Sequence, residues 1–122
     1  MTLQYLEFDY SEDADGSGTF DAMASAWPAQ LPALQAEIAA LLAWAHGQFP
    51  QGLGPAEEGG EWQHDLQGSE ESTTPLTTEF DAASGRLVFV RGTPGPVRTT
   101  LSLSIGGSAH FCAQLRDTFG IE

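Results

Sequence analysis

A period of three to four residues in the hydrophobic pattern of residues 28–49 predicts the longest helix of the chain. Pro28 and Pro32 fall where a first helical turn tolerates proline, because the amide hydrogens of that turn have no partner within the helix. Pro50 and Gly52 then end the segment. We expect the rest of the chain to pack around this helix.

The opposite side of this predicted helix carries a stripe of small residues. A helix face that meets solvent usually carries charged side chains, yet Glu37 is the only Asp, Glu, Lys or Arg of the segment. Two interpretations remain open: alanine is simply the best helix former, or the stripe packs closely against a second helix of this chain or of a partner. The stripe consists of Ala33, Ala36, Ala40, Ala43 and Gly47.

Alternation of apolar and polar residues predicts strands before the helix. Residues 2–10 and residues 19–27 alternate in this way, and the turn-forming segment 13–18 separates them. The simplest interpretation is a β-hairpin whose second strand turns small alanines toward the helix.

After the helix, residues 50–60 have the composition of a loop, and residues 61–67 alternate with Trp62, His64 and Leu66 inward. The polar residues 68–75 predict a connection.

Residues 76–81 and 86–91 flank a short turn ending in Gly85 and predict a second hairpin. Four consecutive apolar residues, Leu87 to Val90, indicate a central strand that is buried on both faces.

The last strand and helix have the clearest patterns. In residues 97–105 the odd positions are mostly aliphatic, whereas Arg98, Thr100, Ser102 and Ser104 face the other way. Residues 109–119 predict a short amphipathic helix, with Ser108 suited to an N-cap and Gly120 to a C-cap.

The resulting order is β-β-α-β-β-β-β-α. Short connections favour antiparallel pairing, and two amphipathic helices would cover one face of the sheet. We therefore predict a single α+β domain over residues 1–122, with an antiparallel sheet and both helices on one face. The predicted core brings together Leu34, Ile38, Leu41, Phe89, Leu101, Leu103 and Phe111.

Charge narrows the range of partners. The chain has a net charge of −13, and its first 85 residues contain 15 acids but no Lys or Arg. Such a surface repels phosphate, which argues against nucleic acid, and it would attract a cation or a basic protein. No apolar run is long enough to span a membrane, and no secretion signal is visible. The single cysteine fits a reducing compartment, so we expect a cytoplasmic protein.

The best motif for metal chemistry is the acidic turn, in which Asp13, Asp15, Ser17 and Asp21 surround Gly16. Oxygen ligands at alternate positions around a glycine are typical of calcium loops. The motif is incomplete because Ala22 stands where the bidentate glutamate belongs, so an ordinary hairpin turn is the preferred interpretation.

Other candidate chemistry is weaker. His110 and Cys112 should point to different helix faces, His46 and His64 have no ligand-spaced neighbour, and Cys112 falls on the core side of its helix. Asp9 and Asp21 could meet across the first hairpin, and an anionic substrate would depend on Arg86, Arg91 or Arg98. We predict no catalytic, cofactor-binding or metal-binding residue.

Two functional hypotheses remain. The first is a small acidic interaction module without catalytic activity, regulatory or immunity-like, that forms a homodimer and could bind a basic protein. Its interface would bury either the alanine stripe or the hydroxyl-bearing face of residues 97–105. The second is a small enzyme or ligand-binding domain that uses an acidic pocket, with or without a divalent cation.

Overall fold

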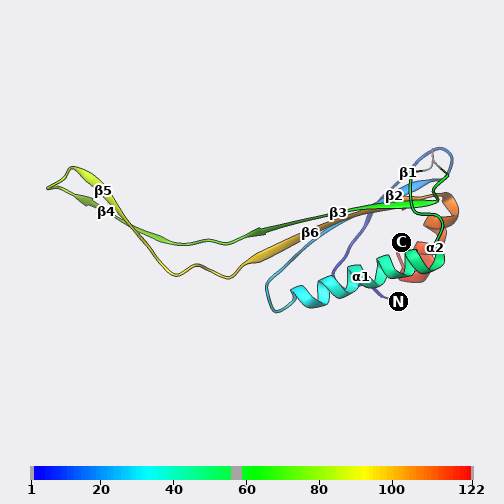
Figure 1. The fold of residues 1–122 in the computed structure, drawn as a ribbon, viewed down its shortest axis with the longest axis horizontal. Helices are drawn as coiled ribbons and strands as arrows, with labels where there is room; N and C mark the ends of the chain where they lie inside the picture. The colour runs from blue at the N-terminus through cyan, green and yellow to red at the C-terminus, as the bar shows by residue number, and fades with distance from the viewer. Residues whose placement is uncertain (1, 56–58, 122) are drawn as a thin grey trace.

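The fold is α+β, as the sequence predicts, in a computed structural model that describes residues 2–55 and 59–121. Two antiparallel sheets and two helices follow in the predicted order (Figure 1). The elements are β1 (Asp9–Glu12), β2 (Gly18–Ala26), α1 (Leu31–Gln48), β3 (Trp62–Glu71), β4 (Leu76–Asp81), β5 (Arg86–Arg91), β6 (Arg98–Gly107) and α2 (Ala109–Phe119).

The body of the molecule is a four-stranded sheet in the order β1-β2-β6-β3. All three strand pairs in it are antiparallel, so β6 is paired on both sides and β1 and β3 form the edges. Between β3 and β6 the chain leaves the body to form a separate two-stranded sheet of β4 and β5. We call residues 76–91 the arm, and Figure 1 shows it extending far from the helices.

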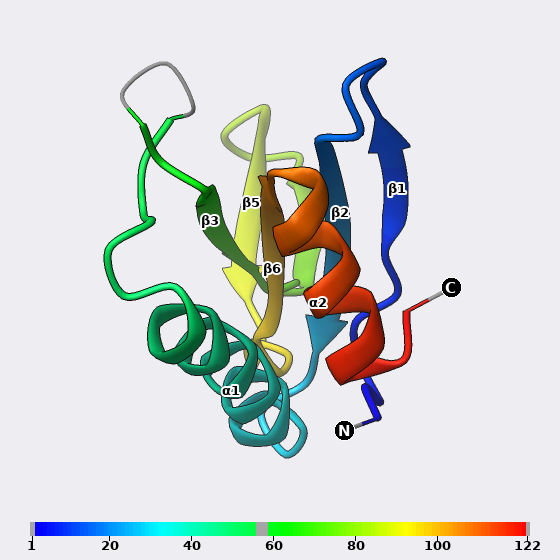
Figure 2. The same ribbon diagram turned by 90° about the vertical axis from the view of Figure 1, so that its right-hand side faces the viewer.

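Both helices lie on the same face of the four-stranded sheet (Figures 1 and 2). The predicted core residues Leu34, Ile38, Leu41, Leu103 and Phe111 are buried together there, and Leu101 is half-buried against them. Strands β2 and β6 contribute Phe20, Ala22 and Ile105 to the same core. The small alanines of β2 therefore face the helical layer, as predicted.

The first strand is shorter than its alternating sequence predicts. Residues 2–8 are not in a strand, and instead the carboxylate of Glu37 on α1 accepts three backbone N–H groups from this segment. Tyr5 and Leu6 donate to its Oε2 at 3.0 and 2.8 Å, and Gln4 donates to Oε1. The one charged residue of the helix thus anchors the N-terminal segment, which satisfies amide groups that a strand would have paired.

Three boundaries also differ from the prediction. Helix α1 begins at Leu31 instead of residue 28, because the preceding residues form a turn in which Gln30 and Leu31 both donate to the carbonyl of Trp27. Strand β3 continues through residues 68–71, which the sequence predicts as a connection, because they pair with residues 98–101 of β6. Strand β6 continues through Gly106 and Gly107, whose lack of a side chain permits close backbone approach by both neighbouring strands.

The caps of α2 are the predicted ones. Ser108 Oγ accepts the N–H of Phe111 at 3.1 Å, and Gly120 takes a left-handed conformation with φ of 65°. Within the described residues, no helix is long and apolar enough to cross a lipid bilayer.

The largest disagreement concerns the second hairpin. Strands β4 and β5 pair as predicted, but β5 is not a central strand and every one of its residues is exposed. Phe89 is 59% exposed and does not belong to the core. The predicted burial of Leu87 to Val90 is therefore wrong for the single chain, because no other element of residues 2–55 and 59–121 forms a layer on either face of the arm.

Candidate interaction surfaces

One face of the arm is mostly apolar. Cross-strand pairing sets Leu76 opposite Arg91, Thr78 opposite Phe89, and Phe80 opposite Leu87, and side chains of opposed residues share a face. These pairs alternate along the hairpin with the others, so all six side chains lie on one side. We call this side the apolar face of the arm. Arg91 is the only charged residue on it.

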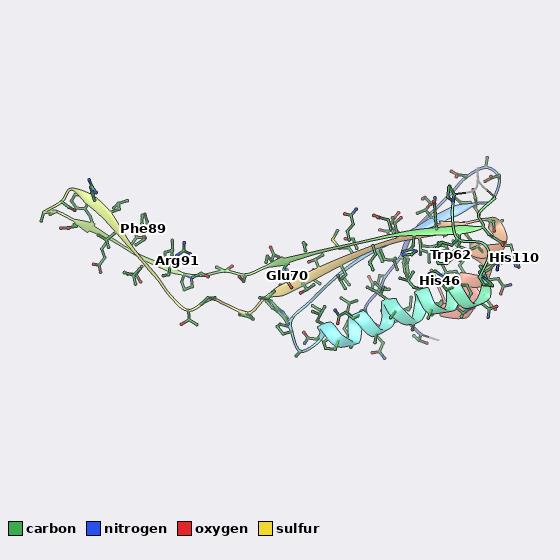
Figure 3. All side chains as sticks on the ribbon, in the orientation of Figure 1. His46, Trp62, Glu70, Phe89, Arg91 and His110 are labelled. Atoms are coloured by element: carbon green, nitrogen blue, oxygen red, sulfur yellow. The ribbon has the colours of Figure 1, made fainter. Side chains whose placement is uncertain are left out.

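The large side chains of this face are all solvent-exposed: Leu76 at 50%, Phe80 at 65%, and Leu87 and Phe89 at 59% each. Exposed apolar residues scattered singly are ordinary, but four on one face of a short hairpin form a patch. Figure 3 shows Phe89 and Arg91 on the arm, far from the helix-covered end of the sheet at Trp62. The arm is therefore a projecting apolar surface.

The opposite face of the arm is mixed. It is formed by the pairs Thr77–Val90, Glu79–Val88 and Asp81–Arg86, which place three charged residues among two valines. We call it the mixed face. Such a composition is ordinary for a strand surface that meets water, so the two faces of one hairpin differ sharply in polarity.

The tip of the arm is a well-formed turn. Asp81 accepts the N–H of Ala83 at 3.0 Å and the hydroxyl of Ser84 at 3.0 Å, and Gly85 has a φ of 71°. The hydrogen bond from Ser84, followed by that from Ala83, lowers the pKa of Asp81 below its usual value. The predicted turn is confirmed, and its hydrogen bonds hold the two strands in register.

The face of the four-stranded sheet that points away from the helices carries a row of acids. Asp9 is paired with Asp21, Asp21 with Ser104, and Ser104 with Asp65. One row across all four strands thus presents three carboxylates, about 14 Å from end to end at ~4.8 Å per strand. We call this side the open face. The predicted meeting of Asp9 and Asp21 is confirmed, whereas the approach of Asp65 was not predicted.

Small and uncharged residues fill the neighbouring positions of the open face. Ser102 lies between Met23 and Gln67 in the next row, and Ser25 and Thr100 share a hydroxyl hydrogen bond of 2.7 Å. Met23 is 71% exposed, an unusual amount for methionine. Because serines separate the longer acids, the face is hollowed over about 510 Å³, lined by Glu7, Asp9, Asp21, Met23, Asp65 and Ser104 among others.

The alanine stripe of α1 is a second uncovered surface. Ala33, Ala36 and Ala43 are exposed, and Ala40 is half-buried. Helix α2 therefore does not cover the stripe, which removes the interpretation that a second helix of this chain packs there. Small residues permit close approach by another backbone, but alone they do not indicate what approaches.

The carboxylates of the acidic turn accept hydrogen bonds from within the turn. Ser17 donates its N–H and its hydroxyl to Asp15 Oδ1 at 3.0 and 2.6 Å, and its hydroxyl also lies 3.4 Å from Asp13 Oδ2. These bonds from Ser17 lower the pKa of Asp15. Asp21 is three pairs beyond Gly18, the residue that follows the turn, which is about 10 Å at ~3.3 Å per residue. It therefore does not join the turn.

A hollow of about 570 Å³ extends from this turn to Glu61, across the end of the sheet. Its carboxylates include Asp13, Asp15, Glu61 and Asp65. Glu61 accepts the hydroxyl of Ser108 at 3.1 Å, as Asp15 accepts that of Ser17. Among the described residues, no three His, Cys, Asp or Glu side chains are grouped so that they could hold a metal ion.

Two histidines that the sequence leaves apart meet around Trp62. The ring centroids of His46 and His64 are 6.5 Å apart, and Trp62 stacks on His64 at 5.7 Å and lies edge-on to His46 at 5.0 Å. His64 is partly buried, as predicted. The pairing was not predicted because it joins the end of α1 to the start of β3, and no spacing along the chain encodes that contact.

His110 and Cys112 point apart, as predicted: His110 is exposed and Cys112 is buried. Burial raises the pKa of the Cys112 thiol, so it is a poor nucleophile. The neighbouring Tyr10 has its pKa raised to about 12, first by burial and then by its hydrogen bond to Glu12. The Arg116 guanidinium lies 4.0 Å from the centroid of the Tyr10 ring. We interpret the cluster of Tyr10, Cys112 and Arg116 as a packing contact, because the Cys112 thiol is buried.

Of the arginines considered for an anionic substrate, Arg86 and Arg91 lie on opposite faces of the arm. Arg98 begins β6 in the four-stranded sheet, and its guanidinium is 5.9 Å from the Trp27 ring centroid. They do not converge on one site. Comparison with protein-family models, with curated proteins and with solved structures finds no match to this chain. The candidate sites are therefore the surfaces described above.

Proposed function

We propose that this protein is a small acidic interaction module without catalytic activity, acting in the cytoplasm, and that it works as a homodimer joined by its arm. The observation that carries the proposal is the apolar face of the arm, with Phe80, Leu87 and Phe89 all more than half exposed. Depletion of charge and enrichment in aromatic residues are features of interface centres.

The pairing of the arm supports the same proposal. A two-stranded hairpin is only marginally stable in water on its own, and stable sheets have more strands or a packed layer on one face. The arm has two strands and no layer, yet its strands are fully paired from Leu76 to Asp81 and from Arg86 to Arg91. A second chain that covers the apolar face would supply the missing layer.

A second copy is the occupant that we favour over an unrelated protein. Two-fold homodimers are the commonest closed assemblies, and in such a dimer each chain gives one arm and receives another, so both apolar faces are covered. A basic protein would suit the acidic body, but it would not account for the apolar face of the arm. The apolar face of the arm thus takes the place of the alanine stripe as the proposed interface.

Static light scattering tests the proposal. At micromolar concentration we expect a mass twice that of the 13.0 kDa chain. The variant Leu87→Ser with Phe89→Ser should be monomeric, because it makes the apolar face polar without touching the hairpin turn. Val88→Ser with Val90→Ser, on the mixed face of the same strand, is the matched control and should remain dimeric. A wild-type mass of 13.0 kDa at these concentrations would reject the proposal.

A further inference from the structure

We propose that the arm of one copy lies with its apolar face on the open face of the second copy's four-stranded sheet, with Arg91 beside the acidic row. This inference rests on the proposed homodimer and names the surface that receives the arm. Three properties of the two surfaces support it: charge, shape and reach.

The charges are complementary. The open face presents Asp9, Asp21 and Asp65 in one row. Asp9 and Asp21 are directly opposite each other, and such a pair of like charges destabilises a sheet. Lys and Arg are absent from the first 85 residues, and Arg116 is engaged with Tyr10 on the helical side. Arg91, the one charge on the apolar face of the arm, is a cation of the right sign to relieve this repulsion.

The shape of the open face also suits an approaching hairpin. Serines 102 and 104 leave the open face hollowed, so that larger side chains of an approaching hairpin can enter between the acids. Met23 stands 71% exposed on this face and offers a flexible apolar contact for aromatic residues such as Phe89. Neither helix covers this side of the sheet (Figure 1).

The arm is long enough to reach across. Its paired strands have six residues each, about 20 Å at ~3.3 Å per residue, whereas the acidic row is about 14 Å wide. It points away from its own body, so it does not lie on its own open face (Figure 1). The alanine stripe is a poorer receptor for this arm, because it presents no acid to Arg91.

Charge reversal in two variants tests the contact. Arg91→Glu reverses the charge on the apolar face of the arm, and Asp21→Arg with Asp65→Arg reverses the charge of two acids on the open face. Each variant alone should have a dimer Kd raised about tenfold or more, because like charges then meet at both contacts. In an equimolar mixture, each arm again meets an open face of opposite charge, so the mixture should regain the wild-type Kd. Analytical ultracentrifugation measures the Kd of each variant alone and of the mixture.

Two controls separate this inference from the homodimer itself. Arg86→Glu lies on the mixed face of the arm, and Asp117→Arg lies on α2 on the far side of the sheet, so both should leave the Kd within about twofold of wild type. If the reversed variants keep the wild-type Kd while Leu87→Ser with Phe89→Ser is monomeric, the homodimer stands and the open face is the wrong receptor. A monomeric wild-type protein would overturn both proposals.

Discussion

Strands β5 and β6 are both rich in aliphatic residues, yet those of β6 are buried or half-buried and those of β5 are exposed to solvent. Leu103 and Ile105 of β6 are at most 1% exposed, whereas Leu87 and Phe89 of β5 are each 59% exposed. Strand β6 has a neighbour on both sides and a helical layer on one face, whereas β5 has one neighbour and no described element packed on either face (Figure 1). Burial is thus set by what covers a strand, and β5 is the strand for which we propose a cover from a second copy.

The contrast between the two strands predicts that truncating a side chain costs the most stability in the body of the molecule. Leu41→Ala should lower the free energy of unfolding by ~2–5 kcal/mol, because Leu41 is fully buried and its truncation leaves a cavity. Urea denaturation followed by circular dichroism measures the loss. Ala39→Gly, at an exposed position of the same helix, is a control that should cost only ~1 kcal/mol through backbone entropy. A loss below about 1 kcal/mol for Leu41→Ala would mean that the helix face is wrongly assigned.

The next effect concerns the segment before β1. Glu37→Ala should lower the unfolding free energy by ~1–3 kcal/mol, because three backbone N–H groups lose their acceptor. Hydrogen exchange by NMR should show faster exchange at Leu6. Gln35→Ala, on an exposed turn of the same helix, is the control and should change stability by less than about 0.5 kcal/mol. Equal losses in both variants would reject the anchoring role of Glu37.

On the arm, truncation of a large side chain should affect stability little. Phe89→Ala should change the unfolding free energy by less than about 1 kcal/mol when denaturation is measured at a concentration where the chain is monomeric, since 59% of Phe89 is already exposed. The same variant should weaken self-association in sedimentation experiments. A loss as large as that of Leu41→Ala would show that Phe89 is buried in the monomer.

The smallest predicted effect is a pH dependence of the arm turn. Because the folded-state pKa of Asp81 is lowered from its ordinary value of 3.8, its stabilising contribution is present above that value and is lost as the pH falls from there through the folded-state pKa. Asp81→Asn should therefore reduce the fall in Tm between pH 5 and pH 3. Glu79→Gln removes the same charge from the same strand without touching the turn. An identical pH profile for Asp81→Asn and wild type would contradict the prediction.

Much of the fold follows from local sequence. The turn at Gly85, the caps at Ser108 and Gly120, and the buried stripe of α1 depend on residues close together in the chain, so their patterns were sufficient. The boundaries of β1 were not predictable in this way, because Glu37 competes for the amides of residues 4–6 from more than 30 positions away.

The arm and the open face show where sequence reasoning ends. Four apolar residues in a row, Leu87 to Val90, have the same pattern whether the covering layer belongs to the same chain or to another one. The outward hydroxyls of β6 were predicted from alternation, and so was the pairing of Asp9 with Asp21 across a hairpin. Asp65 joins that row only through the pairing of β3 with β6, a register between distant segments that no local pattern fixes.

The central claim is that a second copy covers the apolar face of the arm, and hydrogen–deuterium exchange at several protein concentrations tests it most directly. We expect peptides spanning residues 76–91 to be protected at high micromolar concentration and to lose that protection on dilution into the low nanomolar range, while peptides of β6 stay protected throughout. Rapid exchange in the arm that does not depend on concentration, with a protected β6, would contradict the claim.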